Sequence, residues 1–275
     1  MNRKELNPEA SASAAFGERL RRLRDERGWT QDELAQRAGY SGAHISAVET
    51  DRKSPTLPFA HRIDKSFGTG DLFQRMCRAV RQTALLEGFP EFVRYESQAA
   101  EIRLYEVGVV PGLLQTPEYA TVLADGAVKR GMITAQQARE RVSLVAERQA
   151  VFARMHPPMV LAVLDESCIR RPVGPPSVMN AQLLRLMEFA DRPNTVLQVA
   201  PFDMGATRPF DLPVTVLTLQ DRSLISYAES AQRGHLEREI GDVLPMLTAY
   251  HFLQAEAISQ TASAAMINKL RKGLS

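Results

Sequence analysis

The chain has 275 residues, a formal net charge of +2, 44% hydrophobic residues and 24% charged residues. This profile is typical of a soluble globular protein with room for two domains. No run approaches the ~18 apolar residues of a membrane-spanning helix, and residues 1–13 lack the apolar core of a signal peptide. Cys77 and Cys168 stand alone, without metal-site spacing. We therefore expect a reduced, cytoplasmic protein with a disordered tail over residues 1–13.

The first domain is predicted to begin with a basic helix over residues 14–27. Phe16, Leu20 and Leu23 fall at i, i+4 and i+7, which gives one apolar stripe. Residues 1–81 contain fifteen Lys or Arg against eleven Asp or Glu, a balance of +4 that leaves −2 for the remainder. The excess has the sign that phosphate attraction requires. Gly28 ends this helix, and we expect Trp29 to pack in the core.

Residues 30–49 predict two short helices around a tight turn. Thr30 and Glu33 have the spacing of a capping box. Gly39 can adopt the left-handed conformation that ends the first helix, and Ser41 can cap the second. Two packed helices of this kind are common, but a helix-turn-helix of this size also presents its second helix to the DNA major groove.

The spacing of the whole unit resembles the helix-turn-helix of the phage Cro/repressor family, also called the xenobiotic-response-element (XRE) type. The resemblance implies a sequence-specific DNA-binding domain that binds a pseudo-palindrome as a homodimer. The residues on which it rests are Gln31, Leu34, Ala35, Ala38, Gly39, Ser41, Ile45, Ser46 and Glu49.

Candidate DNA contacts follow from this resemblance and from the exposed side predicted for the second helix. Position by position, the family places base edges near Gly42, Ala43, Ser46 and Ala47, and a phosphate near Gln31. Because these are mostly small residues, specificity can depend on thymine methyl groups, on DNA shape or on loop residues. The full set of candidates is Gln31, Ser41, Gly42, Ala43, His44, Ser46, Ala47, Thr50, Arg52 and Lys53.

Two of these assignments have open alternatives. His44 is the one sizeable polar side chain on the second helix, and it is either a base contact or an ordinary surface histidine. Arg52 and Lys53 follow the helix and can reach phosphate, or else belong to a solvated loop. In that loop Asp51 stands where the family usually has glycine.

Further helices over residues 56–67 and 71–86 complete an all-α, five-helix DNA-binding domain over residues 14–87. Gly88, Phe89 and Pro90 then mark a boundary, because glycine and proline disfavour a continuous helix. The rest, residues 88–275, alternates strand and helix patterns and is predicted to be an α+β domain. Strands are expected at 102–107, 159–164, 195–200, 214–219 and 224–228; helices are expected from Thr116 onward and at 134–155, 178–190, 236–253 and 260–270.

This second region resembles the C-terminal domain of actinomycete helix-turn-helix regulators. The matching stretches are VVPGLLQTPEYA at residues 109–120, VLDE at 163–166, RPVG at 171–174, and residues 178–190 and 192–202. The resemblance implies an antitoxin-like transcriptional regulator, often encoded beside a small partner protein.

No catalytic motif of the common hydrolase, nucleotide-binding or metalloprotease kinds occurs, and we expect no enzyme, cofactor or metal. Asp165, Glu166, Cys168, Arg170 and Arg171 form the most reactive-looking cluster, for which structural ion pairs are the simpler interpretation. His235 and Glu239 have metal-ligand spacing on a helix but lack a third ligand.

Three hypotheses remain for the whole chain. In the first, it is a DNA-binding regulator whose C-terminal domain joins subunits and senses a small ligand or a partner protein. A ligand site would be lined by residues 109–116, 201–211 and 227–230, if these are not ordinary core. In the second, it is an antitoxin that neutralises a small partner protein and regulates its own operon. In the third, it is an enzyme with a DNA-binding appendage.

Overall fold

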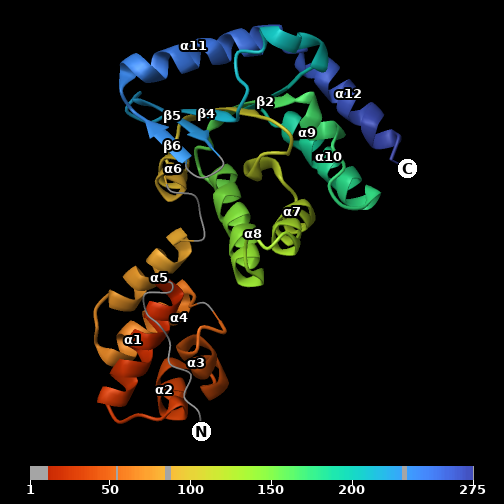
Figure 1. Ribbon diagram of the computed structural model, residues 1–275. Helices are drawn as coiled ribbons and strands as arrows, with labels where there is room; N and C mark the ends of the chain where they lie inside the picture. Colours follow the sequence, from red (N-terminus) through yellow and green to blue (C-terminus); the bar gives the residue numbers. More distant parts are fainter. Residues whose placement is uncertain (1–11, 54, 84–87, 231–233, 275) are drawn as a thin grey trace. The chain divides into compact units, whose positions relative to one another are not determined.

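The computed structural model describes residues 12–53, 55–83, 88–230 and 234–274. Contacts between residues divide the chain into two compact units, Met1–Leu85 and Leu86–Ser275. The described residues of the first unit form helices and no strands, and the second unit is built on a six-stranded sheet with helices (Figure 1). The predicted fold class is therefore confirmed. No helix among these residues is both long and apolar enough to cross a membrane.

The described part of the first unit contains five helices packed around one core. Phe16, Leu20, Leu34, Ile45 and Phe59 are among its fully buried side chains. The helices are α1 (Ala12–Glu26), α2 (Gln31–Ala38), α3 (Gly42–Glu49), α4 (Leu57–Phe67) and α5 (Leu72–Thr83).

The sequence predicts that Trp29 packs in the core, and the structure places it at the edge of that core. It is half-buried, and its ring stacks on Phe67 with the centroids 5.2 Å apart. The Arg37 guanidinium lies over the Trp29 ring, 4.3 Å from its centroid. Trp29 is thus held by packing and by a cation–π contact.

The ends of the first unit differ from expectation in one respect. Ala12 and Ser13, predicted to belong to a disordered tail, form the start of α1. Residues 1–11, and residues 84–86 of the predicted fifth helix, lie outside the described residues.

The sheet of the second unit has the order β3-β2-β1-β4-β5-β6. Strands β1, β2 and β3 are parallel, whereas β4 is antiparallel to β1 and is followed by β5 and β6 in antiparallel pairs. The chain leaves β1 for β2 on one side and returns to β4 on the other. The strands are β1 (Glu101–Glu106), β2 (Met159–Asp165), β3 (Thr195–Ala200), β4 (Val214–Thr218), β5 (Leu224–Glu229) and β6 (Gly234–Glu237).

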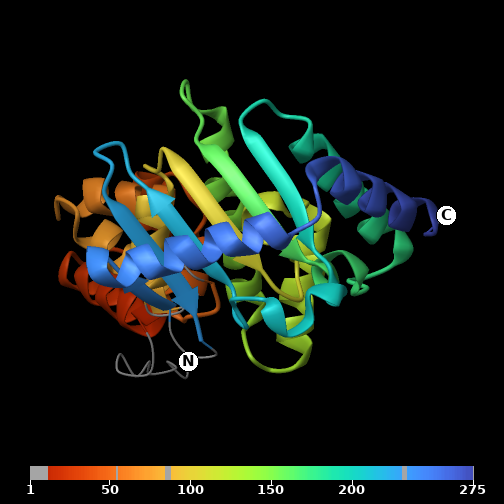
Figure 2. The ribbon, with the colours of Figure 1, turned by 90° about the horizontal axis from the view of Figure 1, so that it is seen from above.

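Alternate residues of the strands enter two separate cores, as the period of a strand requires. On β1, Ile102 and Leu104 belong to one core and Tyr105 to the other. Helix α11 (Ile240–Glu256) covers the Tyr105 face with Val243 and Tyr250, and Figure 2 shows it lying across the strands.

The opposite face of the sheet is covered by the remaining helices of this unit. Among the described residues they are α6 (Phe89–Glu96), α7 (Pro117–Lys129), α8 (Ala135–Gln149), α9 (Glu166–Arg170), α10 (Pro176–Ala190) and α12 (Gln260–Lys272). Of these, α8 packs on α7 rather than in the core itself. The described residues also form the 3₁₀ helices η1 (Gly112–Leu114), η2 (Ala150–Ala153) and η3 (Phe202–Thr207). Met204 of η3 packs against the core on the Tyr105 face.

Four details of the second unit correct the sequence interpretation. The boundary segment itself begins α6, with Pro90 in the first turn, where a proline is tolerated. The helix expected over 134–155 ends at Gln149 and continues as the tighter η2, which directs Val151 into the core. The helices expected from the sequence do not include α9, which residues Glu166–Arg170 form directly after β2. The helix expected from residue 236 begins at Ile240, because residues 234–237 pair with β5 as β6.

Candidate functional site

Local hydrogen bonds fix the first turns of α2 and α3, and a left-handed glycine ends α2. Thr30 Oγ1 accepts from the Glu33 backbone N–H at 3.2 Å, and Glu33 Oε2 accepts from the Thr30 N–H at 2.7 Å. The Thr30 N–H and the Thr30 hydroxyl, which donates to the same oxygen at 3.0 Å, lower the pKa of Glu33. Gly39 has φ +70°, the left-handed region, and Ser41 Oγ accepts from the His44 N–H at 3.2 Å. The predicted capping box, turn glycine and second cap are confirmed.

Two glycines allow α3 to approach its neighbours closely. A Cβ on Gly42 would lie 1.9 Å from Asp32 Oδ1, and a Cβ on Gly17 would lie 2.6 Å from the Val48 carbonyl oxygen. The first clash involves the end of a side chain, whereas the second involves backbone. Gly17 of α1 is therefore a requirement for seating the C-terminal end of α3, and the sequence interpretation missed it.

A buried carboxylate fastens the same end of α3 to α1 and α2. Glu49 is fully buried and accepts from Arg24 Nε at 2.6 Å and Arg24 Nη2 at 3.0 Å. Gln31 Nε2 donates to Glu49 Oε2 at 2.8 Å, and Arg21 Nη2 donates to the Glu49 carbonyl oxygen at 3.0 Å. Gln31, predicted to face phosphate, thus uses part of its amide to hold α3.

The small residues predicted to face base edges lie on the outer side of α3 or near it. Ser41 and Ala43 are exposed, while Gly42, Ser46 and Ala47 are half-buried. Thr50 ends the helix, and its hydroxyl donates to the Ser46 carbonyl oxygen at 2.6 Å.

Arg52 folds back along α3. Asp51 adopts φ +53°, the left-handed conformation that the glycine usual at this position would favour. Arg52 Nε then donates to Thr50 Oγ1 at 2.8 Å, and Arg52 Nη2 donates to Ser46 Oγ at 3.3 Å. The Arg52 guanidinium is therefore placed beside the central turn of α3 and is itself exposed.

His44 is packed more tightly than a surface histidine. Its ring centroid lies 4.6 Å from that of Tyr40 and 5.0 Å from that of Phe59. Nδ1 is 3.2 Å from Lys53 Nζ, and Nε2 is buried without a hydrogen-bond partner among the described residues. Burial and the Lys53 charge lower the pKa of His44, which favours the neutral ring.

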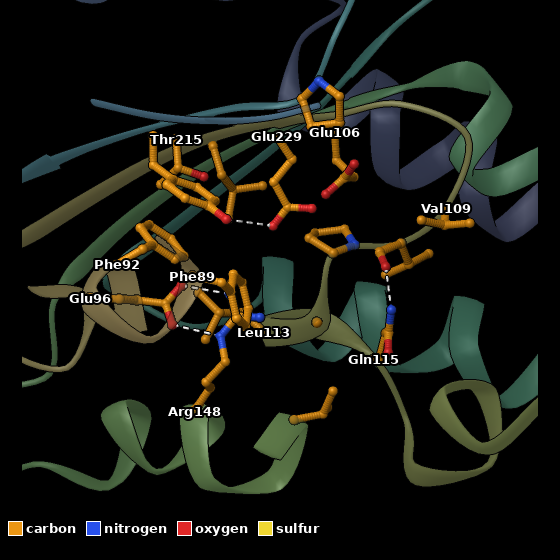
Figure 3. Close-up of a pocket in the computed structure, with 17 residues that line it drawn as sticks. Phe89, Phe92, Glu96, Glu106, Val109, Leu113, Gln115, Arg148, Thr215 and Glu229 are labelled. Carbon is orange, nitrogen blue, oxygen red and sulfur yellow. Dashed lines mark hydrogen bonds and ion pairs between the residues drawn. The ribbon is translucent and has the colours of Figure 1, made fainter. Parts of the chain in front are cut away.

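The second unit contains a cavity of about 250 Å³ beyond the carboxyl end of β1, called here the β1 cavity (Figure 3). It is lined by residues from α6, from the segment after β1, from α8 and from β4 and β5. Of the predicted lining, residues 109–113, Gln115, Tyr227 and Glu229 line it. Leu114, Thr116, Ala228, Ser230 and residues 201–211 do not. The lining residues are Phe89, Phe92, Glu96, Leu104, Glu106, Val109, Val110, Pro111, Gly112, Leu113, Gln115, Val145, Arg148, Pro213, Thr215, Tyr227 and Glu229.

Arg148 and Glu96, which both line the β1 cavity, form an ion pair in its wall. Arg148 Nε and Nη2 donate to the two carboxylate oxygens of Glu96, at 2.7 and 2.8 Å. The Arg148 guanidinium also lies over the rings of Phe89 and Phe92, at 5.1 and 5.8 Å from their centroids. This bidentate pair neutralises both charges.

Two further carboxylates of the β1 cavity lack such a partner. Glu229 Oε1 accepts from the Tyr227 hydroxyl at 3.0 Å, and Glu106 Oε1 accepts from the Val107 N–H at 3.2 Å. No Lys or Arg of the described residues forms an ion pair with either carboxylate. Burial raises the pKa of Glu106 to about 8, and the nearby charge of Glu229 acts in the same direction.

The reactive-looking cluster over residues 165–171 uses its side chains for ion pairs and hydrogen bonds within the fold. Asp165 pairs with Arg208 at 3.3 Å, and Glu166 Oε2 accepts from the Phe202 N–H at 2.8 Å. Cys168 is buried, its Sγ donates to the Glu106 carbonyl oxygen at 3.2 Å, and burial raises its pKa, so the thiol is not activated.

The predicted metal-ligand pair is not on a helix. His235 belongs to β6, and its Nε2 lies 3.8 Å from Glu237 Oε2, while Glu239 precedes α11. Within the described residues, no group of three or more His, Cys, Asp or Glu side chains is arranged to hold a metal ion.

The capped α2, the left-handed glycine turn and the small-residue α3 together define a helix-turn-helix protein. Family comparison agrees: residues 15–76 match a family described as "Helix-turn-helix domain". Residues 89–269 match "Domain of unknown function (DUF5753)". Because this second match spans about two thirds of the chain, the protein belongs to the DUF5753 family.

Two curated relatives are each similar to less than a fifth of the chain. One, from Methanothermobacter thermautotrophicus, is named an uncharacterized HTH-type transcriptional regulator and is 47% identical over 49 residues, 18% of this chain and 71% of the relative. The other, regulator y4dJ of Sinorhizobium fredii, bears the same description and is 35% identical over 52 residues, 19% of this chain and 68% of the relative. No solved structure matches the chain.

Proposed function

We propose that the protein is a sequence-specific DNA-binding transcriptional regulator of the Cro/repressor type, and that α3 enters the major groove. The observation that supports this most strongly is the arrangement of α2 and α3, with both caps formed and α3 anchored by Glu49. The two relatives, both named as HTH-type transcriptional regulators, point the same way.

The outer side of α3 suits close approach to base edges. Ser41, Gly42, Ala43, Ser46 and Ala47 are small, so the helix backbone can lie deep in the groove. Alanine methyl groups there can contact thymine methyl groups, and sequence-dependent groove shape can add to specificity.

Arg52 supplies the long polar side chain that α3 lacks. Its hydrogen bonds to Thr50 and Ser46 direct the guanidinium along α3, toward the groove rather than toward the flanking backbone. A guanidinium in that place can donate two hydrogen bonds to guanine O6 and N7. We assign Arg52 to a base contact, with Thr50 positioning it.

The proposal gives phosphate contacts to Lys53 and Gln31 and a packing role to His44. Lys53 is exposed and follows α3, so its ammonium is assigned to phosphate. The His44 ring is enclosed by Tyr40 and Phe59 and supports α3 by packing. Gln31 begins α2, and the part of its amide not used by Glu49 can donate to phosphate.

The second unit is proposed to join subunits and to bind an effector, as in actinomycete antitoxin-like regulators. The β1 cavity supports an effector site. Exposed Ile240, Leu244 and Phe252 on α11 support a protein contact, which we assign to a homodimer on a pseudo-palindromic site. An antitoxin function would place a small partner protein there instead. Light scattering gives the mass of the purified chain, alone and with the protein encoded beside it. The mass distinguishes a homodimer from a complex with that neighbour.

The central experiment is selection of genomic DNA fragments by the purified full-length chain, followed by sequencing. A regulator of this kind enriches fragments that share two half-sites about one helical turn apart. Recovery of fragments without a common motif, with the neighbour protein present and absent, would overturn the proposal.

A further inference from the structure

The β1 cavity lies where open sheets commonly bind ligands. It sits beyond the carboxyl end of β1, and the chain leaves β1 toward β2 but returns to β4 on the opposite side. Crevices at such a reversal of strand order are preferred ligand sites in open sheets that contain parallel strands. The position indicates a ligand site without naming the ligand.

The charges of the β1 cavity specify the sign of the ligand. Glu96 and Arg148 neutralise each other through two hydrogen bonds. The remaining carboxylates, Glu106 and Glu229, receive only an N–H and a tyrosine hydroxyl from the described residues. Figure 3 shows them next to each other on one side of the cavity, with Arg148 on the opposite side. In the absence of a cation, burial keeps Glu106 protonated near neutral pH. A cation bound between the two carboxylates would balance the charge of Glu229 and favour ionisation of Glu106 as well.

The walls of the β1 cavity suit an organic cation. Phe92 stacks on Tyr227 with the centroids 4.1 Å apart, and Phe89 packs beside Phe92 at 5.8 Å. The same aromatic faces already hold one cation, the Arg148 guanidinium. Leu113 and Pro111 complete an apolar lining. Aromatic faces together with carboxylates are the combination that recognises ammonium groups in water-poor sites.

A metal ion or an anion fits these residues less well. No described group of three or more His, Cys, Asp or Glu side chains is arranged around a common metal position. An anion would face Glu106 and Glu229 and would have to compete with Glu96 for Arg148.

We propose that the β1 cavity binds a small organic amine, with its ammonium group between Glu106 and Glu229 and its apolar body against Phe89, Phe92 and Tyr227. The cavity of about 250 Å³ has the volume of about eight water molecules, which suits a ligand of roughly ten non-hydrogen atoms. The idea that this amine is the effector rests on the proposed regulatory function; the binding itself does not.

The test is calorimetric titration of the purified full-length chain, without DNA, with three matched probes. These are 2-phenylethylamine, the neutral 2-phenylethanol and the anionic 3-phenylpropanoate. A short acetylated peptide with a central arginine tests whether the cation comes from a protein. The amine is expected to bind at least tenfold more tightly than the alcohol, and the acid and the peptide more weakly still.

Variants locate the site. Glu106→Gln and Glu229→Gln are each expected to weaken amine binding about tenfold, while Glu118→Gln, on the exposed side of α7, leaves it unchanged. Far-UV circular dichroism checks that each variant is folded. Equal binding of amine and alcohol, binding of the peptide alone, no amine binding, or insensitivity to both variants would overturn the assignment. DNA binding, measured separately, is unaffected by that failure.

Discussion

Glu49→Ala tests how strongly the buried carboxylate holds α3. Its removal leaves Arg24, which is only 9% exposed, without its bidentate partner, and Gln31 loses an acceptor. Breaking a buried pair from one side typically costs about 3–5 kcal/mol. Because Arg24 keeps hydrogen bonds to Asp25 and to the Trp29 carbonyl, both at 2.8 Å, we expect the lower value, about 3 kcal/mol.

That loss is large for a domain of this size. At about 0.05–0.15 kcal/mol per residue, some 70 residues give a free energy of unfolding of about 4–10 kcal/mol. With a urea slope of about 1–1.5 kcal/mol per molar, the unfolding midpoint is expected to fall by about 2–3 M.

Trp29 makes the measurement specific to the first unit. It is the single tryptophan of the sequence, and it stacks on Phe67 within that unit. Its emission during urea titration therefore reports the unfolding of the helix-turn-helix unit in the full-length chain. Glu26→Ala is the matched control, because Glu26 is 56% exposed and pairs with Arg22 at 3.8 Å; it is expected to cost about 0.5 kcal/mol or less. A Glu49→Ala effect as small as that of the control would refute the reasoning.

Three further predictions concern other parts of the chain. Lys53→Ala is expected to weaken binding to all DNA sequences and to reduce the salt slope by about 1, measured by fluorescence anisotropy at several salt concentrations; an unchanged slope contradicts the phosphate assignment. Gly17→Ala is expected to cost about 1–3 kcal/mol in the Trp29 titration, since its Cβ would lie 2.6 Å from the Val48 carbonyl oxygen; no destabilisation argues against this close contact. Glu106→Gln is expected to stabilise the second unit more at pH 8 than at pH 5, because native Glu106, with a pKa of about 8, binds a proton that the unfolded chain releases near 4.5. Because Glu106 is half-buried, solvent screening reduces the upper limit of about 1.36 kcal/mol per pH unit, so we expect about 2 kcal/mol, from thermal unfolding followed by circular dichroism; a pH-independent difference contradicts it.

The helix-turn-helix was predictable because its signals are local. Thr30 with Glu33, Gly39, and Ser41 act on backbone groups within three or four residues, so their spacing alone defines the caps. Strands β1 to β5 were predicted close to their observed positions, because short apolar runs are typical of strands that are buried on both faces. Strand β6, which has no buried residue, was missed.

Features that depend on distant residues could not be obtained in this way. Arg24 and Glu49 are 25 positions apart, and nothing in their spacing distinguishes them from other charged residues. The β1 cavity draws its wall from segments as far apart as Phe89 and Glu229. Helix α6 was missed for a different reason: Gly88 and Pro90 were interpreted as a break, although proline is also typical of a helix start.

The most direct test of the DNA-binding account is the effect of Arg52→Ala on base discrimination. Anisotropy is measured for the wild-type chain and the variant on a selected site and on each single-base substitution of it. The account predicts that one guanine position per half-site, at which substitution costs the wild type about 1–3 kcal/mol, becomes indifferent in the variant while the other positions keep their preferences. Arg75→Ala, on the exposed side of α5, serves as the control. An equal loss of affinity on every sequence, with all preferences retained, would contradict the account.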